Sequence, residues 1–372
     1  MPSMPNWKRL LAVGVLGVAL LAAGCGGTQA PAAQNEPPTP QQPSTPQTIE
    51  LHGAGASFPN PLYQKWFYRY HEEHPNVQIS YQSIGSGGGQ KAILEKTVDF
   101  AGSDAPMKDE QLASAPGKIL HIPTVMGAVV ITYNLPDVTQ PLKMTPEVVA
   151  DIFLGKIKKW NDPKLVDLNP DANLPNMDIS VVHRSDGSGT TNIFTDYLSK
   201  VSPEWKEKVG MGTAVEWPVG VGGKGNEGVS GQVKQTPGAI GYVELAYAIQ
   251  NKLPTALLKN QAGEFVEASI DGVVKAAAGF ADQMPDDFRI SIVNAPGSGA
   301  YPIAAYTYLL IYQEQSDEAK GKALVDMIAW VIQNGDADAR ELLYAPLPDN
   351  VKKKVLDALK TVTYNGKPLL GN

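Results

Sequence analysis

Three short stretches of glycine and serine constrain the fold of this chain more than any other feature of its sequence. In each of them an apolar stretch is followed by glycine, then by a hydroxyl residue, and then by a helical pattern. This order is typical of a corner where a strand ends and a helix begins, with the hydroxyl residue as the helix N-cap. The three stretches are Gly53–Trp66, Ser83–Lys96 and Ser185–Leu198, and the expected N-cap residues are Ser57, Ser86 and Ser188.

Apolar runs and helical patterns alternate along the body of the chain, which indicates an α/β fold with mostly parallel sheets. A body of about 320 residues is long enough for two lobes. Strands are expected at Asn76–Ser80, Val125–Tyr133, Asp178–Arg184, Arg289–Pro296 and Pro302–Tyr312. Helices are expected at Leu62–Glu73, Gln90–Thr97, Asn192–Lys200, Asp271–Gln283, Glu318–Asn334 and Lys352–Val362.

The sequence pattern of the N-terminal region differs from that of the body. Lys8 and Arg9 precede an apolar run, Leu10–Ala23, and small residues follow it. The run is shorter than the roughly 20 residues that a membrane span needs. A basic start, a short apolar segment and small residues predict a secretory signal peptide over residues 1–24.

The only cysteine of the chain, Cys25, stands at the end of this run after Ala-Gly. This position resembles the bacterial lipobox, although Ala22 occupies the place where leucine is usual. We therefore expect a lipidated Cys25, and the alternative is a cysteine in an ordinary signal peptide. The segment that follows is rich in proline and glutamine and nearly uncharged, so residues 25–48 are expected to form a tether between the lipid and the body.

The net charge of the chain argues against some classes of binding partner. The formal net charge is −7, and removal of Lys8 and Arg9 with the signal leaves −7 − 2 = −9. An acidic body argues against binding to nucleic acid or to an anionic membrane surface. The sequence contains no G-x-S-x-G elbow and no G-x-x-x-x-G-K-[ST] loop. An extracytoplasmic phosphatase or serine hydrolase is therefore a remote alternative.

Each glycine-serine corner is suited to binding an anion. The first turn of a helix leaves about four backbone N–H groups unpaired, and the helix dipole adds about half a positive charge there. Glycine lets the backbone approach a ligand closely, and a serine can donate its own O–H. One such corner alone is more often an ordinary helix cap, worth about 1 kcal/mol. Three corners together with an arginine favour a common anion site.

Three charged residues add chemistry to these corners. Arg184 can clamp an oxyanion with two parallel hydrogen bonds, and Asp186 can hold its guanidinium; the alternative is an ordinary surface pair. Asp104 can accept the proton of monohydrogen phosphate, whereas sulfate has no such proton to offer. The alternative for Asp104 is an N-cap of a helix within Ala105–Leu112.

Two other patterns are weak evidence for a site. Gly220–Gly225 fits G-x-G-x-x-G, but Trp217-Pro218 precede it where a dinucleotide site needs a buried strand, so a packed glycine-rich loop is expected. His71 and His74 are three residues apart and do not form H-E-x-x-H, which predicts an exposed helix end and no metal site.

In their order along the chain, the quoted corners and their neighbours closely resemble segments of the phosphate-binding proteins of bacterial phosphate ABC transporters. The similar segments are GAGASFPNPLYQKW, SIGSGGGQKAI, TVDFAGSDAPM, LGKIKKWNDP, RSDGSGTTNIFTDYL, GVGGKGNEGV, TPGAIGYVE and YAPLPDNV. They extend from Gly53 to Val351 and so cover nearly the whole body.

The resemblance implies a phosphate site assembled from all three corners. The residues that match phosphate ligands are Ser57, Phe58, Ser86, Asp104, Arg184, Ser188, Gly189 and Thr190, with Asp186 as a supporting residue. In these roles Asp104 accepts the phosphate proton and Arg184 is the clamp. Many members of the family have threonine at the position of Ser57, so the hydroxyl is kept.

The resemblance also implies a two-lobed, hinged periplasmic-binding-protein fold of type II, in which each lobe is a mostly parallel sheet flanked by helices. Lobe I would comprise residues 49–125 and 301–372, and lobe II residues 126–300. The expected function is to capture phosphate between the lobes and deliver it unchanged to ABC permease subunits and their ATPase. We expect a monomer with neither cofactor nor metal. Binding of arsenate, which carries the same proton, and a phosphate sensor that transports nothing stay open as alternatives.

Overall fold

The computed structural model of the chain describes residues 48–371. The predicted signal peptide over residues 1–24, the predicted lipidation site Cys25 and the tether up to residue 47 lie outside the described residues. Within residues 48–371, every helix falls short of the length and apolarity that a membrane span requires.

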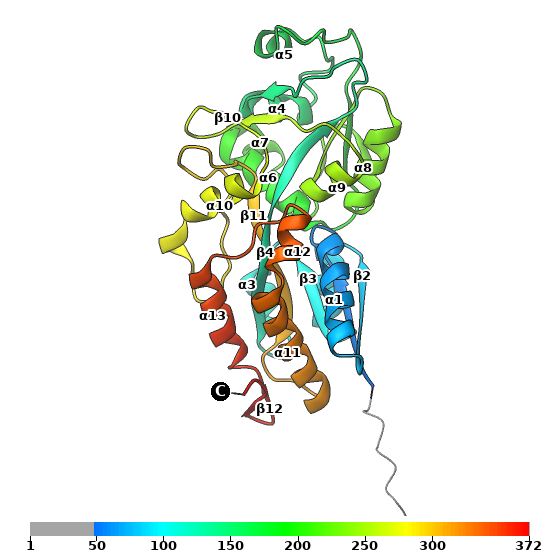
Figure 1. The fold of residues 1–372 in the computed structure, drawn as a ribbon. Helices are drawn as coiled ribbons and strands as arrows, with labels where there is room; N and C mark the ends of the chain where they lie inside the picture. Colours follow the sequence, from blue (N-terminus) through cyan, green and yellow to red (C-terminus); the bar gives the residue numbers. More distant parts are fainter. Residues whose placement is uncertain (1–47, 372) are drawn as a thin grey trace, which may run out of the picture. The chain divides into compact units, whose positions relative to one another are not determined.

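One eight-stranded sheet runs through the described residues (Figure 1). In spatial order its strands are β2 (Val77–Ser83), β1 (Ile49–Gly55), β3 (Phe100–Ser103), β11 (Ala304–Tyr312), β4 (Ile119–Tyr133), β8 (Ala239–Glu244), β6 (Ser180–Arg184) and β7 (Val221–Gly223). The outer pairings are parallel, and the three central pairings, which involve β4 or β11, are antiparallel. The α/β fold is therefore as predicted, and its parallel pairings lie on either side of an antiparallel centre.

Strand β4 is shared between two halves of the body. Up to Ala128 it pairs with β11, and from Val129 onward it pairs with β8. We call β1, β2, β3 and β11 with their helices the β1 half, and β6, β7 and β8 with theirs the β8 half. The β1 half is drawn in blue, cyan and orange, and the β8 half mostly in green (Figure 1). The predicted lobe boundary at residue 125 falls close to this change of partner.

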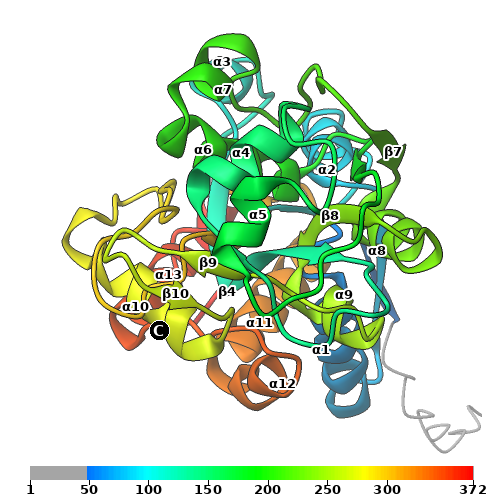
Figure 2. The same ribbon diagram turned by 90° about the horizontal axis from the view of Figure 1, so that it is seen from above.

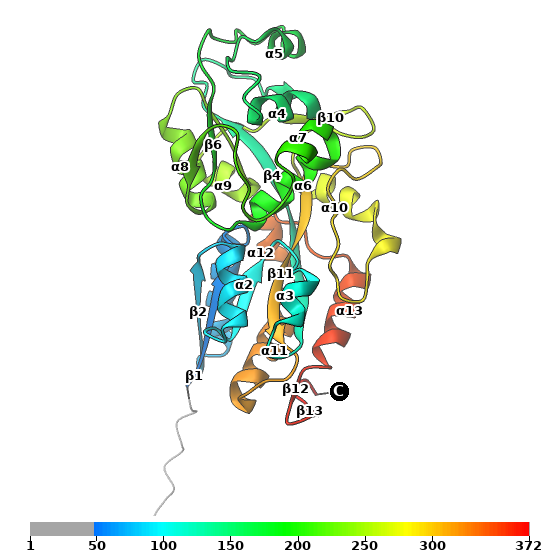
Figure 3. The ribbon, with the colours of Figure 1, turned by 180° about the vertical axis from the view of Figure 1, so that it is seen from behind.

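Helices cover both faces of the sheet in each half. Those of the β1 half are α1 (Asn60–Glu73), α2 (Ser86–Leu94), α3 (Asp109–Ala113), α11 (Glu318–Asn334), α12 (Asp336–Glu341) and α13 (Asp349–Leu359). Those of the β8 half are α4 (Pro146–Phe153), α5 (Pro163–Leu168), α6 (Gly189–Val201), α7 (Pro203–Lys208), α8 (Gly225–Gln235) and α9 (Leu245–Gln250). Helices α1 and α11 lie on one face of the β1 half, and α2 and α3 on the other (Figures 1 and 3). In the β8 half, α6 and α8 lie on opposite sides of β8 (Figure 2).

Smaller elements complete the described body. Strands β10 (Phe265–Val266), β9 (Leu257–Lys259) and β5 (Lys143–Met144) form a three-stranded sheet, and β12 (Thr363–Tyr364) pairs with β13 (Lys367–Pro368). Helix α10 (Ile270–Ala278) is followed by a short 3₁₀ turn, Ala281–Gln283.

Several helices begin where the sequence supplies a cap and a proline together. The side chains of Thr145, Asp162 and Ser202 each accept a hydrogen bond from a backbone N–H of the first helical turn. A proline follows each of them at the start of α4, α5 and α7. Proline suits this position because its φ is already helical and its missing N–H would be unpaired there in any case.

The predicted strand at Arg289–Pro296 is wrong, because this segment is a loop. Its apolar residues Ile292 and Val293 are buried, as the pattern indicated. However, Phe288 and Asn294 adopt φ values of 60° and 55°, in the left-handed region that interrupts extended backbone. The alternation of apolar residues therefore indicated correctly that this segment is buried. It did not indicate a strand, because the backbone turns too often to pair with one.

Other predicted helices are present, with predicted bounds in one case and shifted bounds in another. Helix α11 has the predicted bounds, Glu318–Asn334, whereas the helix predicted at Asp271–Gln283 ends at Ala278 and the 3₁₀ turn follows separately. Helix α8 was not predicted, because six glycines and polar residues fill the surrounding segment Gly220–Gln235 with weak helix formers.

Candidate functional site

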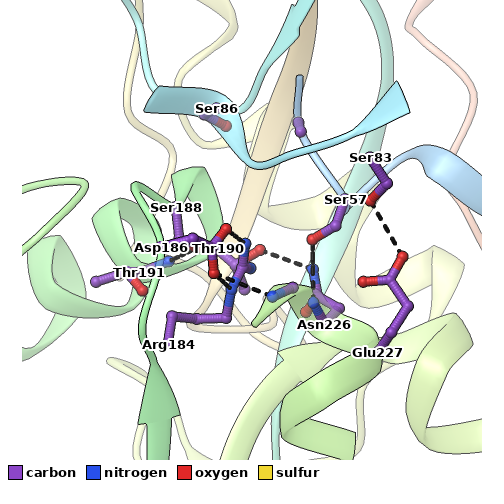
Figure 4. A network of polar contacts seen from close by, with 12 residues as sticks. Ser57, Ser83, Ser86, Arg184, Asp186, Ser188, Thr190, Thr191, Asn226 and Glu227 are labelled. Atoms are coloured by element: carbon purple, nitrogen blue, oxygen red, sulfur yellow. Dashed lines mark hydrogen bonds and ion pairs between the residues drawn. The ribbon is translucent and has the colours of Figure 1, made fainter. Parts of the chain in front are cut away.

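The three glycine-serine corners meet between the β1 half and the β8 half (Figure 4). Ser57, Ser86, Asp104, Arg184 and Ser188 are all buried, with at most 3% of each residue exposed. The first three come from the β1 half and the other two from the β8 half. The structure therefore brings together residues that lie up to 131 positions apart between Ser57 and Ser188.

The first corner differs from its prediction in one respect, because Ser57 is not the N-cap of α1. Pro59 holds that position, and the helix begins at Asn60. The Ser57 hydroxyl instead accepts hydrogen bonds from the backbone N–H of Asn226, at 3.1 Å, and from its Nδ2, at 2.8 Å. The side chain of Phe58, next to it, is fully buried.

In the second corner the N-cap lies one residue before the predicted Ser86. Gly85 is the N-cap of α2, with a φ of 84° that favours glycine, and Ser86 is the first helical residue. The Ser86 Oγ accepts a hydrogen bond from the backbone N–H of Asp104 at 3.1 Å, and it donates to Asp104 Oδ2 at 3.3 Å. The Ser86 hydroxyl thus lies against the predicted proton acceptor.

The third corner has the predicted geometry. Ser188 is the N-cap of α6, and its Oγ accepts a hydrogen bond from the N–H of Thr191 at 3.0 Å. Gly189 and Thr190 form the first turn of this helix. A Cβ atom added to Gly189 would lie 2.4 Å from Ser86 Oγ and 2.5 Å from Asp104 Oδ2, so only glycine allows the two halves to approach this closely.

Arg184 is buried and pairs with the half-buried Asp186, which excludes the alternative of an ordinary surface ion pair. Arg184 Nε donates to Asp186 Oδ1 at 2.8 Å and Nη2 donates to Oδ2 at 2.6 Å, and the arginine side chain is 1% exposed. The backbone N–H of Gly225 also donates to Asp186 Oδ1 at 3.0 Å. Burial alone would raise the pKa of Asp186, but the bonds from Arg184 and the backbone hold that pKa below its usual value.

One nitrogen of this guanidinium has no partner among the described residues. Arg184 Nη1 is buried and forms no hydrogen bond there, although Nε and Nη2 are both held by Asp186. A buried charged donor left without an acceptor costs free energy. The position therefore suits an anion that accepts a hydrogen bond from Nη1.

Asp104 is a buried carboxyl and not a helix cap. Helix α3 begins five residues later, at Asp109, and Lys108 is its N-cap. Thr307 Oγ1 of β11 donates to Asp104 Oδ1 at 2.8 Å. Burial raises the pKa of Asp104 to about 7, although bonds from Thr307 and Ser86 and the charge of Arg184 act in the opposite direction. This carboxyl can consequently exchange a proton near neutral pH.

Two functional candidates were missed by the sequence reasoning. Asn226, at the start of α8, is fully buried and contacts Ser57, Thr190 and the backbone of Glu244 (Figure 4). The only signal for it was an asparagine after glycines in the similar segment GVGGKGNEGV.

Glu244 is also fully buried; its Oε2 accepts from the N–H of Ala246 and contacts the hydroxyl of Tyr344. Burial raises the pKa of Glu244 well above its usual value.

The stretch Gly220–Gly225 differs from its prediction of a loop, because a short strand, β7, lies within it and helix α8 begins at its last residue. The first N–H groups of α8 are already bound within the protein, however. Gly225 N–H donates to Asp186 and Asn226 N–H to Ser57. Because these N–H groups are already bound in the polar network between the corners, they are not free to bind a dinucleotide phosphate at the start of α8.

The two histidines lie at the end of α1 as predicted, but both are half-buried and not fully exposed. Helix α1 ends at Glu73, and His74 is its C-cap. His71 Nδ1 contacts the carbonyl oxygen of Val77 at 2.7 Å. Residues 48–371 contain no group of three or more His, Cys, Asp or Glu side chains arranged to hold a metal ion.

Comparisons with known proteins agree with this architecture. The profile of the PBP superfamily domain matches residues 37–333. The chain is 48% identical over 318 residues to the phosphate-binding protein PstS of Pasteurella multocida (strain Pm70), which covers 85% of this chain and 92% of that protein. It is 39% identical over 384 aligned positions to the phosphate-binding protein PstS of Methanocaldococcus jannaschii, covering 95% of this chain and 96% of that one.

A solved structure shows the same fold at lower identity. The X-ray crystal structure of a phosphate binding protein from Stenotrophomonas maltophilia matches with a TM-score of 0.66 and 22% identity, covering 86% of this chain and 96% of that chain. The chain therefore belongs to the PBP superfamily and, within it, to the family of the phosphate-binding proteins PstS.

Proposed function

We propose that this protein binds inorganic phosphate between the β1 half and the β8 half and delivers it, chemically unchanged, to an ABC permease. One observation carries the proposal: a buried guanidinium and a buried carboxyl face the same site. Arg184 offers Nη1, and Asp104 offers a carboxyl with a pKa of about 7. Monohydrogen phosphate suits both, because its oxygens accept from Arg184 and its O–H donates to Asp104.

The other residues of the site supply donors for an anion. The hydroxyls of Ser57, Ser86 and Thr190 and the first turn of α6 surround the same position, and we assign them, with Phe58, Ser188 and Gly189, as phosphate ligands. Micromolar binding needs about 8 kcal/mol. Hydrogen bonds to charged groups contribute roughly 1.5–3 kcal/mol each, so a set of this size is sufficient even after the cost of ordering the site. The shared name of the relatives, phosphate-binding protein, supports the same ligand.

We further infer that the two halves are the lobes of a hinged protein that closes on phosphate. We assign residues 49–125 with 301–372 to one lobe and residues 126–300 to the other, and the change of pairing partner along β4 at Ala128–Val129 supports this division. They touch at the site: Gly87 N–H donates to the carbonyl oxygen of Gly187 at 2.8 Å. A ligand that contacts residues of both halves favours the closed arrangement because it binds that arrangement better.

Calorimetric titration tests the ligand. A form comprising residues 26–372, freed of bound anion by unfolding and refolding, would be titrated with phosphate, arsenate and sulfate. We expect tight one-to-one binding of phosphate and no detectable heat with sulfate. Arsenate carries the same proton, so its titration shows whether the site separates two protonated oxyanions. Absence of phosphate binding by the refolded protein would contradict the proposal.

The N-terminal sequence supports a location outside the cytoplasm. We infer that the protein is lipidated at Cys25 and that a proline-rich tether holds a monomeric body at the outer face of a membrane. Expression of the whole chain with Cys25→Ser should therefore release most of the protein from the membrane fraction, whereas Thr28→Ser should leave it there. Immunoblotting of the membrane and soluble fractions measures this distribution. Equal membrane association of both variants would contradict the lipid anchor.

A further inference from the structure

We propose that Asn226 is a positioning residue that fixes the hydroxyl of Ser57 as a hydrogen-bond donor toward the bound anion and orients the hydroxyl of Thr190 beside it. This inference rests on the proposed phosphate binding and assigns a role to a residue outside the ligand set. It follows from counting the donors and acceptors around one fully buried amide.

The orientation of the Asn226 amide is determined by its surroundings. Its Oδ1 accepts a hydrogen bond from the backbone N–H of Glu244 at 2.9 Å. A backbone N–H can only donate, so the oxygen must face Glu244 and the nitrogen must face the two hydroxyls. Nδ2 lies 2.8 Å from Ser57 Oγ and 3.1 Å from Thr190 Oγ1, and its two protons serve one hydroxyl each.

The Ser57 hydroxyl is thereby left with a single free role. A serine oxygen accepts two hydrogen bonds and donates one. Both acceptor positions are used by Asn226, one by its backbone N–H at 3.1 Å and one by Nδ2 at 2.8 Å. The remaining capacity is the O–H proton, which can only be donated. Phosphate oxygens are acceptors, so a hydroxyl held in this way needs no rotation when the ligand arrives.

The same amide joins the two halves of the protein. Ser57 belongs to the β1 half, whereas Thr190 and Asn226 belong to the β8 half (Figure 4). The bond from Asn226 to Ser57 exists only when the halves are in contact. Contact between the two halves therefore orients the Ser57 hydroxyl as a donor in the same arrangement in which the ligand is bound.

Asn226→Asp tests the donor role with little change of shape. Aspartate can still accept from Glu244 N–H, but its other oxygen cannot donate and instead accepts the protons of Ser57 and Thr190. We expect phosphate affinity at pH 8 to fall by at least about 100-fold, since two charged hydrogen bonds are lost. As the pH falls from 8 to 5, the introduced carboxyl takes up a proton and can donate again, so the ratio of wild-type to variant affinity should shrink.

Asn226→Leu separates the donor effect from the added charge. The leucine side chain is neutral and cannot donate, so phosphate affinity should fall by about tenfold or more, and its ratio to wild type should not change with pH. In the Ser57→Ala background the loss caused by Asn226→Leu should be smaller, because part of it acts through that hydroxyl. Asn251→Asp is the matched control, since Asn251 also donates to a serine hydroxyl, that of Ser230, which is not among the assigned phosphate ligands.

Three results would overturn this inference, and a fourth would overturn the proposed function. Thermal unfolding without ligand must first show that each variant is folded. Ser57→Ala should lose affinity because its O–H faces the ligand, and unchanged affinity in this variant would remove the donor on which the proposal depends, even where the Asn226 variants do not fold. Wild-type binding together with unchanged affinity in the Asn226 variants would overturn this inference alone. A loss that neither recovers at low pH in Asn226→Asp nor depends on Ser57 would overturn it too. Failure of the wild-type protein to bind phosphate would overturn the proposed function instead.

Discussion

Asp104→Asn is expected to lower the preference for phosphate over sulfate by about tenfold to 100-fold, mainly by admitting sulfate. In the wild-type protein an ionised Asp104 meets sulfate with lone pairs only, and an opposed pair of acceptors is unfavourable. Asparagine can donate to a sulfate oxygen through Nδ2 and can still accept the proton of phosphate through Oδ1. Parallel titrations with both anions at pH 8 measure the ratio directly.

The control for this variant is Asp109→Asn, which removes a carboxyl that is 84% exposed and pairs with Arg289. It should leave both affinities unchanged. An unchanged ratio of affinities in Asp104→Asn would show that the carboxyl does not select the ligand.

The pH dependence of the wild-type protein tests the same carboxyl without a mutation. Burial raises the pKa of Asp104 from 3.8 to about 7. Below pH 7 the group is protonated and can donate, so wild-type affinity for sulfate should rise as the pH falls through 7, while that of Asp104→Asn should stay level. Stability without ligand changes in the same sense: the contribution of Asp104 is fully present below its usual pKa of 3.8 and is lost as the pH rises through 7. Asp104→Asn should therefore melt above the wild type at pH 8, and the two should converge near pH 4.

Gly189→Ala is expected to weaken phosphate binding by about 100-fold or more while each half stays folded. The new methyl carbon would lie 2.4 Å from Ser86 Oγ and 2.5 Å from Asp104 Oδ2. These atoms belong to the opposite half, so the overlap is relieved only if the halves stay apart. Alanine suits a helical first turn, so α6 itself should tolerate the change.

Two measurements check the steric argument for Gly189. Titration gives the affinity, and small-angle scattering with and without phosphate gives the change in radius of gyration, which should vanish in Gly189→Ala. The matched control is Gly231→Ala in α8, where an added Cβ meets no atom within 4 Å. Full affinity and full contraction in Gly189→Ala would contradict the close contact.

Local sequence predicted those parts of the site that depend on neighbours in the chain. The Arg184–Asp186 pair and the Ser188 cap each join residues two or three positions apart, and both are present. For Ser57 and Ser86, the sequence predicted a corner but not the partner of the hydroxyl. The partner of Ser57, Asn226, is 169 residues away, so no pattern within one segment could reveal it.

The remaining errors have related causes. The segment Arg289–Pro296 has the apolar residues of a strand, and its burial comes from packing that does not need extended backbone. Helix α8 contains glycines that disfavour a helix, and contacts with β8, β6 and β7 stabilise it in the folded protein. In both places tertiary packing outweighs local propensity.

The shared strand β4 has a mechanical consequence for a protein that opens and closes. It passes without interruption from its pairing with β11 to its pairing with β8, at Ala128–Val129. Opening must therefore flex or twist a hydrogen-bonded ribbon, which resists deformation more than a loop does. In the hinge motion that we propose, such a ribbon would act as an elastic joint that limits the opening angle between the halves and favours one shape without ligand.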